Sequence, residues 1–199
     1  MSNTLQPLSD HWRNRYLFMR HGHSLANQQR VIVSSPGRGV ENFGLSEHGE
    51  QQLAQLVADW QWPVPTRVVH SDFLRTTQTA AHVAARFELV PSVDTRLRER
   101  NFGELEGLGD ELYPSVWALD AEDAEHQHHG VEALSRVASR MQAVIGDWEQ
   151  QVSGEVILLV SHGDPLQILL TALAGKPLTS HREQTPLAPA SITLYGHGV

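Results

Sequence analysis

Two short apolar runs constrain the fold of this 199-residue chain more than any other feature. The run at 16–19 stops at His21, the run at 156–160 stops at His162, and a glycine follows each histidine. Each run has the length of a buried strand, and a glycine permits a sharp turn and a close approach of a ligand. Ligands of open α/β sheets bind at the carboxyl ends of the strands, so we expect both imidazoles at one edge of one sheet.

Helical patterns and further short apolar runs alternate between and around these two runs. Strands that alternate with helices imply a three-layer α/β sandwich, a mainly parallel sheet with helices on both faces. The chain length predicts a single domain over 1–199, with the polar residues 1–14 as a flexible lead-in. The expected strands are 16–19, 67–71, 89–93, 156–160 and 190–195, and the expected helices are 25–29, 47–60, 73–87, 110–120 with a break at Pro114, 130–150 and 165–173.

Composition limits the partners. The formal net charge of −8 argues against nucleic acid or an anionic membrane, because both need a basic surface. It does not exclude a phosphorylated substrate, since the local potential of a cleft decides that. The chain has no cysteine, which excludes disulfides and thiolate catalysis. No apolar run reaches the length of a membrane span and no signal peptide is apparent, so we expect a cytoplasmic protein.

The first histidine lies in a specific motif. Arg20, His21 and Gly22 are followed by Ser24 and Asn27, and Ser24 is also a good cap for a short helix. This pattern resembles the signature of the histidine phosphatase superfamily, which is also called phosphoglycerate mutase-like. The matching residues extend from Arg20 to the second histidine and so cover most of the chain.

The stretch 71–80 resembles a second element of that family, Ser-Pro-Leu-x-Arg-Ala-x-x-Thr-Ala. Its arginine is Arg75. Asp72 stands in place of the proline and Thr76 in place of the alanine. Neither departure removes a catalytic group, and Arg75 follows a strand end beside the expected site.

The stretch 97–107 resembles a third element, Leu-x-Glu-x-x-x-Gly-x-x-Glu-Gly. Its first acid is Glu99. The charge pattern alone favours a surface glutamate balanced by Arg98 and Arg100, whereas the match in spacing favours a catalytic acid. A general acid needs a raised pKa, so we expect both arginines to point away from it.

The resemblance implies phosphoryl transfer without a metal or other cofactor. His21 would attack phosphorus and form a phosphohistidine, and Glu99 would protonate the leaving group and later activate water. Planar guanidinium groups suit the phosphoryl oxygens. The residues expected to bind the substrate are Arg20, Gly22, Ser24, Asn27, Arg75 and His162. Of these, Arg20, Arg75 and His162 are also expected to be catalytic, together with His21 and Glu99.

Several functions fit this pattern. The main prediction is a phosphatase that hydrolyses a small phosphorylated metabolite. Phosphoglycerate mutases of the family usually have Trp where this chain has Ala26, and a longer insertion before the second histidine, which favours the phosphatase. A phosphohistidine-protein phosphatase needs an open site, whereas the segments 28–44 and 108–129 are expected to form walls. A binding module without activity would be expected to have lost one of the catalytic groups. The substrate and the oligomeric state, including a homodimer, stay open.

Two other features bear on metal binding and on substrate binding. The stretch 126–129 is rich in histidine, which can bind transition metals, but it lies in a polar and presumed mobile segment without defined ligand spacing, so we expect no metal site. Arg30 and Arg38 lie in the loop after the first motif, where either could reach an anionic substrate.

Overall fold

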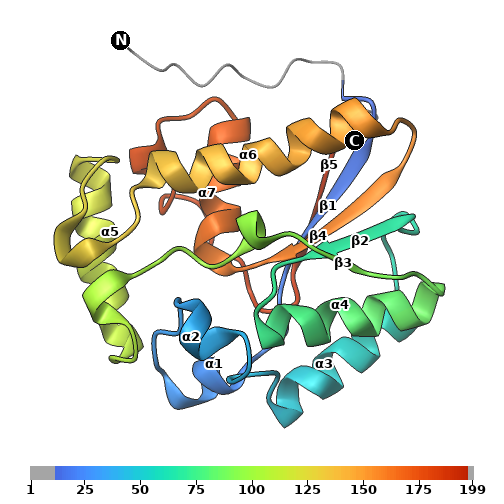
Figure 1. Cartoon of the computed structure of the whole chain (residues 1–199), viewed down its shortest axis with the longest axis horizontal. Coiled ribbons are helices and arrows are strands. Elements are labelled where there is room, and N and C mark those ends of the chain that lie inside the picture. Colours follow the sequence, from blue (N-terminus) through green and yellow to red (C-terminus); the bar gives the residue numbers. More distant parts are fainter. Residues whose placement is uncertain (1–11, 197–199) are drawn as a thin grey trace.

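The computed structural model describes residues 12–196, which form one five-stranded sheet with helices on both sides (Figure 1). The strand order is β3-β2-β4-β1-β5. Strand β5 runs antiparallel to β1, and the other three pairings are parallel. The predicted mainly parallel α/β sheet is therefore confirmed. The strands are β1 (Arg15–Arg20), β2 (Arg67–His70), β3 (Ser92–Val93), β4 (Val156–Ser161) and β5 (Ile192–Tyr195).

The two histidine-bearing strands are direct neighbours. β1 and β4 pair in parallel with Arg20 opposite Ser161. The backbone N–H of His21 donates to the carbonyl of Ser161 at 3.0 Å. The two His-Gly dipeptides therefore leave the sheet side by side at the same edge, as the sequence predicted.

Alternation along β1 divides the core into two layers. Tyr16 and Phe18 face the helices α6 (Leu134–Gln151) and α7 (Gly163–Leu173). Leu17 and Met19 face the opposite layer, which contains α3 (Glu47–Ala58) and α4 (Leu74–Phe87). All four of these β1 side chains are buried, as period-two alternation in a sheet covered on both faces requires.

Short helices and turns complete the chain at the carboxyl edge of the sheet. Helix α1 (Leu25–Gln29) begins at Ser24, whose hydroxyl accepts from the N–H of Asn27. In the portion covered by the structure, no helix is long and apolar enough to cross a membrane. The other elements are α2 (Pro36–Gly39), η1 (Thr95–Leu97), η2 (Gly103–Leu105), η3 (Asp110–Leu112), α5 (Tyr113–Glu122), η4 (His128–Gly130) and η5 (Leu178–Ser180).

Several predicted boundaries are wrong. Helix α6 begins at Leu134 and not at 130, because Gly130 has a positive φ of 70° and leaves the helical region. Pro114 does not break α5 but stands in its first turn, where proline is tolerated. Helix α7 begins two residues before Pro165, with His162 at its N-cap position. The strand expected at 89–93 is reduced to β3.

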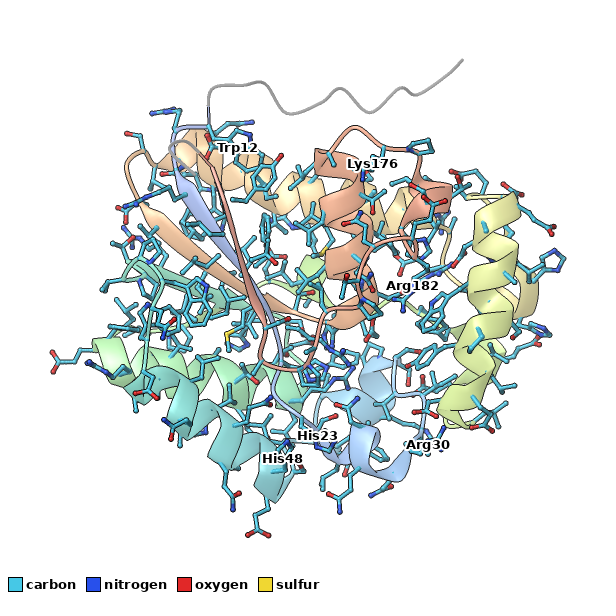
Figure 2. All side chains as sticks on the ribbon, turned by 180° about the vertical axis from the view of Figure 1, so that it is seen from behind. Trp12, His23, Arg30, His48, Lys176 and Arg182 are labelled. Carbon is cyan, nitrogen blue, oxygen red and sulfur yellow. The ribbon has the colours of Figure 1, made fainter. Side chains whose placement is uncertain are left out.

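The prediction of a flexible lead-in over 1–14 is wrong for residues 12–14. Residues 1–11 lie outside the described part of the chain. Trp12 packs its ring against Tyr16 and Tyr195 with centroids 5.2 and 4.9 Å apart, beside the start of β1 (Figure 2). The amide of Asn14 is buried and donates to the carbonyl of Val152 at 3.1 Å. Aromatic packing and amide hydrogen bonds therefore anchor residues 12–14 against the sheet.

Candidate active site

His21 lies directly after β1 and is 3 % exposed. Its Nδ1 lies 2.7 Å from the carbonyl oxygen of Gly22, and a carbonyl can only accept, so Nδ1 carries the proton. Nε2 is therefore the unprotonated nitrogen and carries a lone pair. Burial, together with the charges of Arg75 and Arg20, holds the pKa of His21 well below its usual range. The imidazole is thus neutral at physiological pH, with Nε2 unprotonated.

Two arginines face this lone pair. Arg75 stands in the first turn of α4, and its Nε donates to Nε2 of His21 at 3.1 Å. Its Nη2 donates to the carbonyl of Val33 at 2.9 Å, whereas its Nη1 is buried without a partner among residues 12–196. Arg20 donates from Nη1 to the carbonyl of Leu187 at 2.5 Å, and its buried Nε is likewise unpartnered. Buried donors without acceptors are costly, and these two belong to residues that line the same pocket. An anion at that point would satisfy them.

Glu99 supplies a carboxyl group on the same pocket. One of its oxygens lies 3.7 Å from Nη2 of Arg75 and 3.8 Å from Nδ1 of His162, and the other accepts from the backbone N–H of Arg100. Its side chain is only 10 % exposed. Burial raises the pKa of Glu99 to about 7, although the charge of Arg75 acts against this. Near neutral pH the group can both donate and accept a proton, as a general acid–base requires.

The two arginines beside Glu99 in sequence are directed elsewhere. Arg98 forms two hydrogen bonds with the carboxylate of Asp72, the residue that replaces the family's proline. Arg100 is fully buried and pairs with Asp120 at 2.7 Å and with Asp164 at 3.3 Å. Both guanidinium groups are thus engaged away from the carboxyl of Glu99, as expected.

The pocket has a volume of about 290 Å³, at the lower end for small-molecule sites. Val31 and Val33 from the segment 28–44 form one wall, and Tyr113 and Trp117 from 108–129 form another, so both segments act as predicted. Arg182 closes a third side, with its guanidinium carbon 3.6 Å from the centroid of the Trp117 ring. Figure 2 shows Arg182 next to α5.

The sequence did not predict that Arg182 and Asp164 line the pocket. Arg182 forms hydrogen bonds with Gln167 and, at 3.5 Å, with Asp164. Arg182 follows the short helix η5 in a loop whose sequence has no periodicity or motif. Only the tertiary contact with Trp117 therefore shows that Arg182 belongs to the pocket. Asp164 could have been predicted as a site residue from the sequence, because it follows His162 by two residues in the first turn of α7.

The remaining predicted binding residues differ in their surroundings. The N–H of Gly22 donates to Thr79 and its carbonyl accepts from His21, and Gly22 does not line the pocket. Ser24 and Asn27 do line it. The Oδ1 of Asn27 already accepts from the backbone N–H and the hydroxyl of Ser24, so a contact with a substrate would use Nδ2. Gly22 therefore positions the His21 imidazole through its carbonyl and does not itself line the pocket.

Hydrogen bonds connect the segment 97–107 to the wall formed by 28–44. Gly103 and Gly107 have positive φ angles of 54° and 79°, which glycine adopts without strain. The carboxylate of Glu106 accepts from the backbone N–H and the hydroxyl of both Ser34 and Ser35. Four hydrogen bonds to one carboxylate hold the loop that carries Val33 in place.

The histidine-rich stretch does not form a metal cluster. His126 is buried and its Nε2 lies 2.6 Å from Asp120, so the expectation of a mobile polar segment is wrong at this residue. Within the part of the chain that the structure covers, no group of three His, Cys, Asp or Glu side chains could hold a metal ion. Arg30 pairs with Asp110 at 3.2 Å. Neither Arg30 nor Arg38 lines the pocket.

Comparison with known proteins gives consistent matches. The family model for the histidine phosphatase superfamily (branch 1) matches residues 16–198. A glucosyl-3-phosphoglycerate phosphatase of Mycobacterium tuberculosis is 31 % identical over 196 residues, which covers 92 % of this chain and 86 % of that protein. A probable phosphoglycerate mutase GpmB of Yersinia pestis is 32 % identical over 170 residues, covering 82 % of this chain and 76 % of that protein. The solved structure of a mycobacterial glucosyl-3-phosphoglycerate phosphatase in complex with VO3 has a TM-score of 0.76 and 29 % identity, covering 90 % of this chain and 91 % of that chain.

Proposed function

This chain belongs to the histidine phosphatase superfamily, and we propose that it hydrolyses a small-molecule phosphomonoester through a phosphohistidine on His21. The observation that carries the proposal is the orientation of that imidazole. Its Nδ1–H is held by the Gly22 carbonyl, and its unprotonated Nε2 accepts from Arg75 beside a pocket with two guanidinium groups. A fixed tautomer with an unprotonated nitrogen at the pocket is what nucleophilic attack on phosphorus requires.

In the first half-reaction, Nε2 of His21 forms a bond to phosphorus as the bond from phosphorus to the ester oxygen breaks. The unpartnered N–H groups of Arg20 and Arg75 would hold the non-bridging oxygens, which carry the negative charge of the transition state. The protonated carboxyl of Glu99 would give its proton to the leaving oxygen. Its pKa of about 7 leaves a large fraction of the group protonated at neutral pH.

In the second half-reaction, a water molecule replaces the leaving alcohol. The carboxylate of Glu99, now ionised, takes a proton from this water as it attacks the phosphohistidine. Nε2 of His21 leaves with its lone pair, and inorganic phosphate is released. No step needs a metal ion, and the pKa of Glu99 near neutrality suits both directions of proton transfer.

The pocket supports a small phosphorylated metabolite as substrate. Its volume of about 290 Å³ leaves limited room beside the phosphoryl group, and the wall of Tyr113, Trp117 and Arg182 would contact the rest of the molecule. Relatives named as glucosyl-3-phosphoglycerate phosphatases make phosphorylated glycerate derivatives the first compounds to test. A cytoplasmic location and a homodimer stay predictions.

The decisive experiment measures hydrolysis of p-nitrophenyl phosphate by the wild type and by His21→Ala, each with EDTA. We expect activity that survives EDTA in the wild type and is abolished in His21→Ala. Acid quenching of the wild type with a ³²P-labelled substrate should trap label on His21. Equal turnover by the two proteins would refute His21 as the nucleophile, and activity lost to EDTA would refute metal-free chemistry.

A mutase is the second candidate, because a probable phosphoglycerate mutase is among the relatives. A mutase returns the phosphoryl group to another hydroxyl and does not pass it to water. Incubation with phosphoglycerates, with and without bisphosphoglycerate, separates the two functions. Isomer interconversion that is faster than phosphate release would favour the mutase.

A further inference from the structure

A series of hydrogen bonds between buried hydroxyl groups ends at the Nε2 atom of the second histidine. His162 is fully buried, and its Nε2 lies 2.8 Å from the hydroxyl oxygen of Ser71. That hydroxyl lies 2.7 Å from the hydroxyl of Thr76, which stands where the family element resembled by 71–80 has alanine. Ser71 and Thr76 are also fully buried, so these hydrogen bonds are isolated from solvent.

The direction of these hydrogen bonds follows from their far end. The hydroxyl oxygen of Thr76 lies 2.7 Å from the carbonyl oxygen of Phe73 and 2.8 Å from that of Ser71. Carbonyl oxygens only accept, so the single proton of Thr76 points to one of them. Thr76 is then an acceptor toward Ser71, whose own proton is used in that bond. Ser71 can therefore only accept from His162, which requires a proton on Nε2.

The other side of the ring leads to the same tautomer. Arg75 donates from Nε to Nδ1 of His162 at 3.2 Å. A guanidinium group cannot accept, so Nδ1 must present a lone pair. The hydroxyl oxygen of Ser71 also accepts from the backbone N–H of Phe73, at 3.4 Å. Together with the bond from His162, this uses both of its lone pairs. Two independent constraints thus place the proton of neutral His162 on Nε2.

This tautomer has a consequence for phosphate binding. Nδ1 of His162 and Nε2 of His21 both lie within hydrogen-bond distance of the same N–H of Arg75, so a phosphoryl group bonded to His21 would lie next to Nδ1. A lone pair at Nδ1 would repel a phosphoryl oxygen. Nδ1 becomes a donor only when a second proton is added to the ring.

We propose that Ser71 and Thr76 are positioning residues that fix the proton of His162 on Nε2, so that this histidine can donate to a phosphoryl group only by taking up a second proton on Nδ1. The proton comes from solvent and the imidazolium forms when the anion binds. The part that concerns the phosphoryl group rests on the proposed function, whereas the tautomer of the free protein does not.

The charged groups around His162 oppose the imidazolium until an anion binds. Arg75, Arg20 and Arg140 face it with positive charge, the neutral ring of His21 lies beside it, and Glu99 is 3.8 Å from Nδ1. Burial and the charge of Arg75 hold the pKa of His162 well below its usual range, so the free protein has a neutral ring. A bound phosphate dianion would offset the three arginines and favour the imidazolium.

The first test is ¹⁵N NMR of histidine-labelled protein without ligand, with the His162 signals identified by their loss in His162→Gln. In the wild type we expect a protonated Nε2 and an unprotonated Nδ1. Thr76→Val and Thr76→Ala free the proton of Ser71 to turn toward His162 and should shift the population toward a protonated Nδ1. Thr76→Ser restores the hydroxyl and should behave as wild type. The matched control is Thr77→Val, at the next, exposed position of α4.

The second test is calorimetry of inorganic phosphate binding in two buffers of different ionisation enthalpy, at about pH 8, where phosphate is a dianion and a free histidine is neutral. Wild type, Thr76→Ser and Thr77→Val should take up a proton on binding. Thr76→Val and Thr76→Ala should lose most of this uptake. Their affinity should be about fivefold to tenfold lower near pH 6, because a charge-assisted hydrogen bond is replaced by a neutral one.

The outcomes separate the proposal from the proposed function. A proton on Nδ1 in the free wild type would overturn the proposal, as would a wild-type tautomer and wild-type uptake in both Thr76→Val and Thr76→Ala. If phosphate fails to bind at all, the proton-uptake step and the proposed function are both wrong, and the NMR result alone still decides the tautomer. Thermal unfolding of each variant shows whether it is folded.

Discussion

Replacing Glu99 by glutamine should lower activity and raise stability in the same protein. Burial raises the pKa of this carboxyl from its ordinary value near 4.5 to about 7. Between these two pH values the unfolded chain releases a proton that the folded chain keeps. The free energy of unfolding therefore falls as pH rises through this window and stays lower above it.

The pKa difference corresponds to a stability loss on the order of 3 kcal/mol above pH 7, since each pH unit of displacement is worth about 1.4 kcal/mol. The side chain is only 10 % exposed, so solvent screening reduces this value little. Glutamine keeps the hydrogen bond from the Arg100 backbone N–H but cannot ionise. Glu99→Gln should thus be more stable by about 2–3 kcal/mol at pH 8, or roughly 4–10 °C in Tm, and should show little difference at pH 4.

The same substitution removes the proton donor for the leaving alcohol. We expect kcat to fall by about a hundredfold to ten-thousandfold on an alkyl phosphate. The loss should be smaller on p-nitrophenyl phosphate, because p-nitrophenolate leaves without a proton. Glu104→Gln is the matched control: it lies in the same segment, but its side chain is 78 % exposed. It should change neither Tm nor kcat.

The assays are thermal unfolding at pH 4 and pH 8 and initial rates on both substrates. A Tm gain of the same size at both pH values would refute the assignment of a raised pKa to Glu99. An alkyl phosphatase activity equal to wild type would refute its role as general acid.

Three further substitutions test the rest of the site. Arg75→Lys keeps the charge but loses the planar guanidinium, including the Nε–H that contacts both histidines. It should lower kcat on p-nitrophenyl phosphate by about a hundredfold to a thousandfold, and an unchanged kcat would contradict a role of Arg75 in the transition state. Trp117→Ala removes the surface on which Arg182 stacks and should raise KM for bulky phosphomonoesters with little change for p-nitrophenyl phosphate; a uniform change in KM would argue against a contact with the leaving group. Arg100→Met leaves the buried carboxylate of Asp120 without its guanidinium partner and should lower the free energy of unfolding by about 3–5 kcal/mol in urea titrations at pH 7, and a loss under 1 kcal/mol would contradict the buried ion pair.

The sequence determined the architecture and the position of His21. Apolar runs of strand length and amphipathic helical patterns are local properties, and they fix which segments form strands and which faces are buried. A histidine directly after a buried strand must lie at the edge of the sheet. For this reason the adjacency of His21 and His162 was predictable once both were recognised as strand ends. The residues of α6 could be predicted as a helix, but its start could not, because the positive φ of Gly130 and the packing of Val131 depend on distant contacts.

Only the tertiary structure decided the charge and hydrogen-bond state of the site. Arg98 and Arg100 flank Glu99 in sequence, yet one pairs with Asp72 and the other is buried against Asp120, because segments far apart in the chain meet there. The raised pKa of Glu99 comes from burial, a property of the whole fold. Two further features depend on long-range contacts that no local sequence pattern encodes. One is the closure of the pocket by Arg182, and the other is the series of hydrogen bonds from Thr76 to His162.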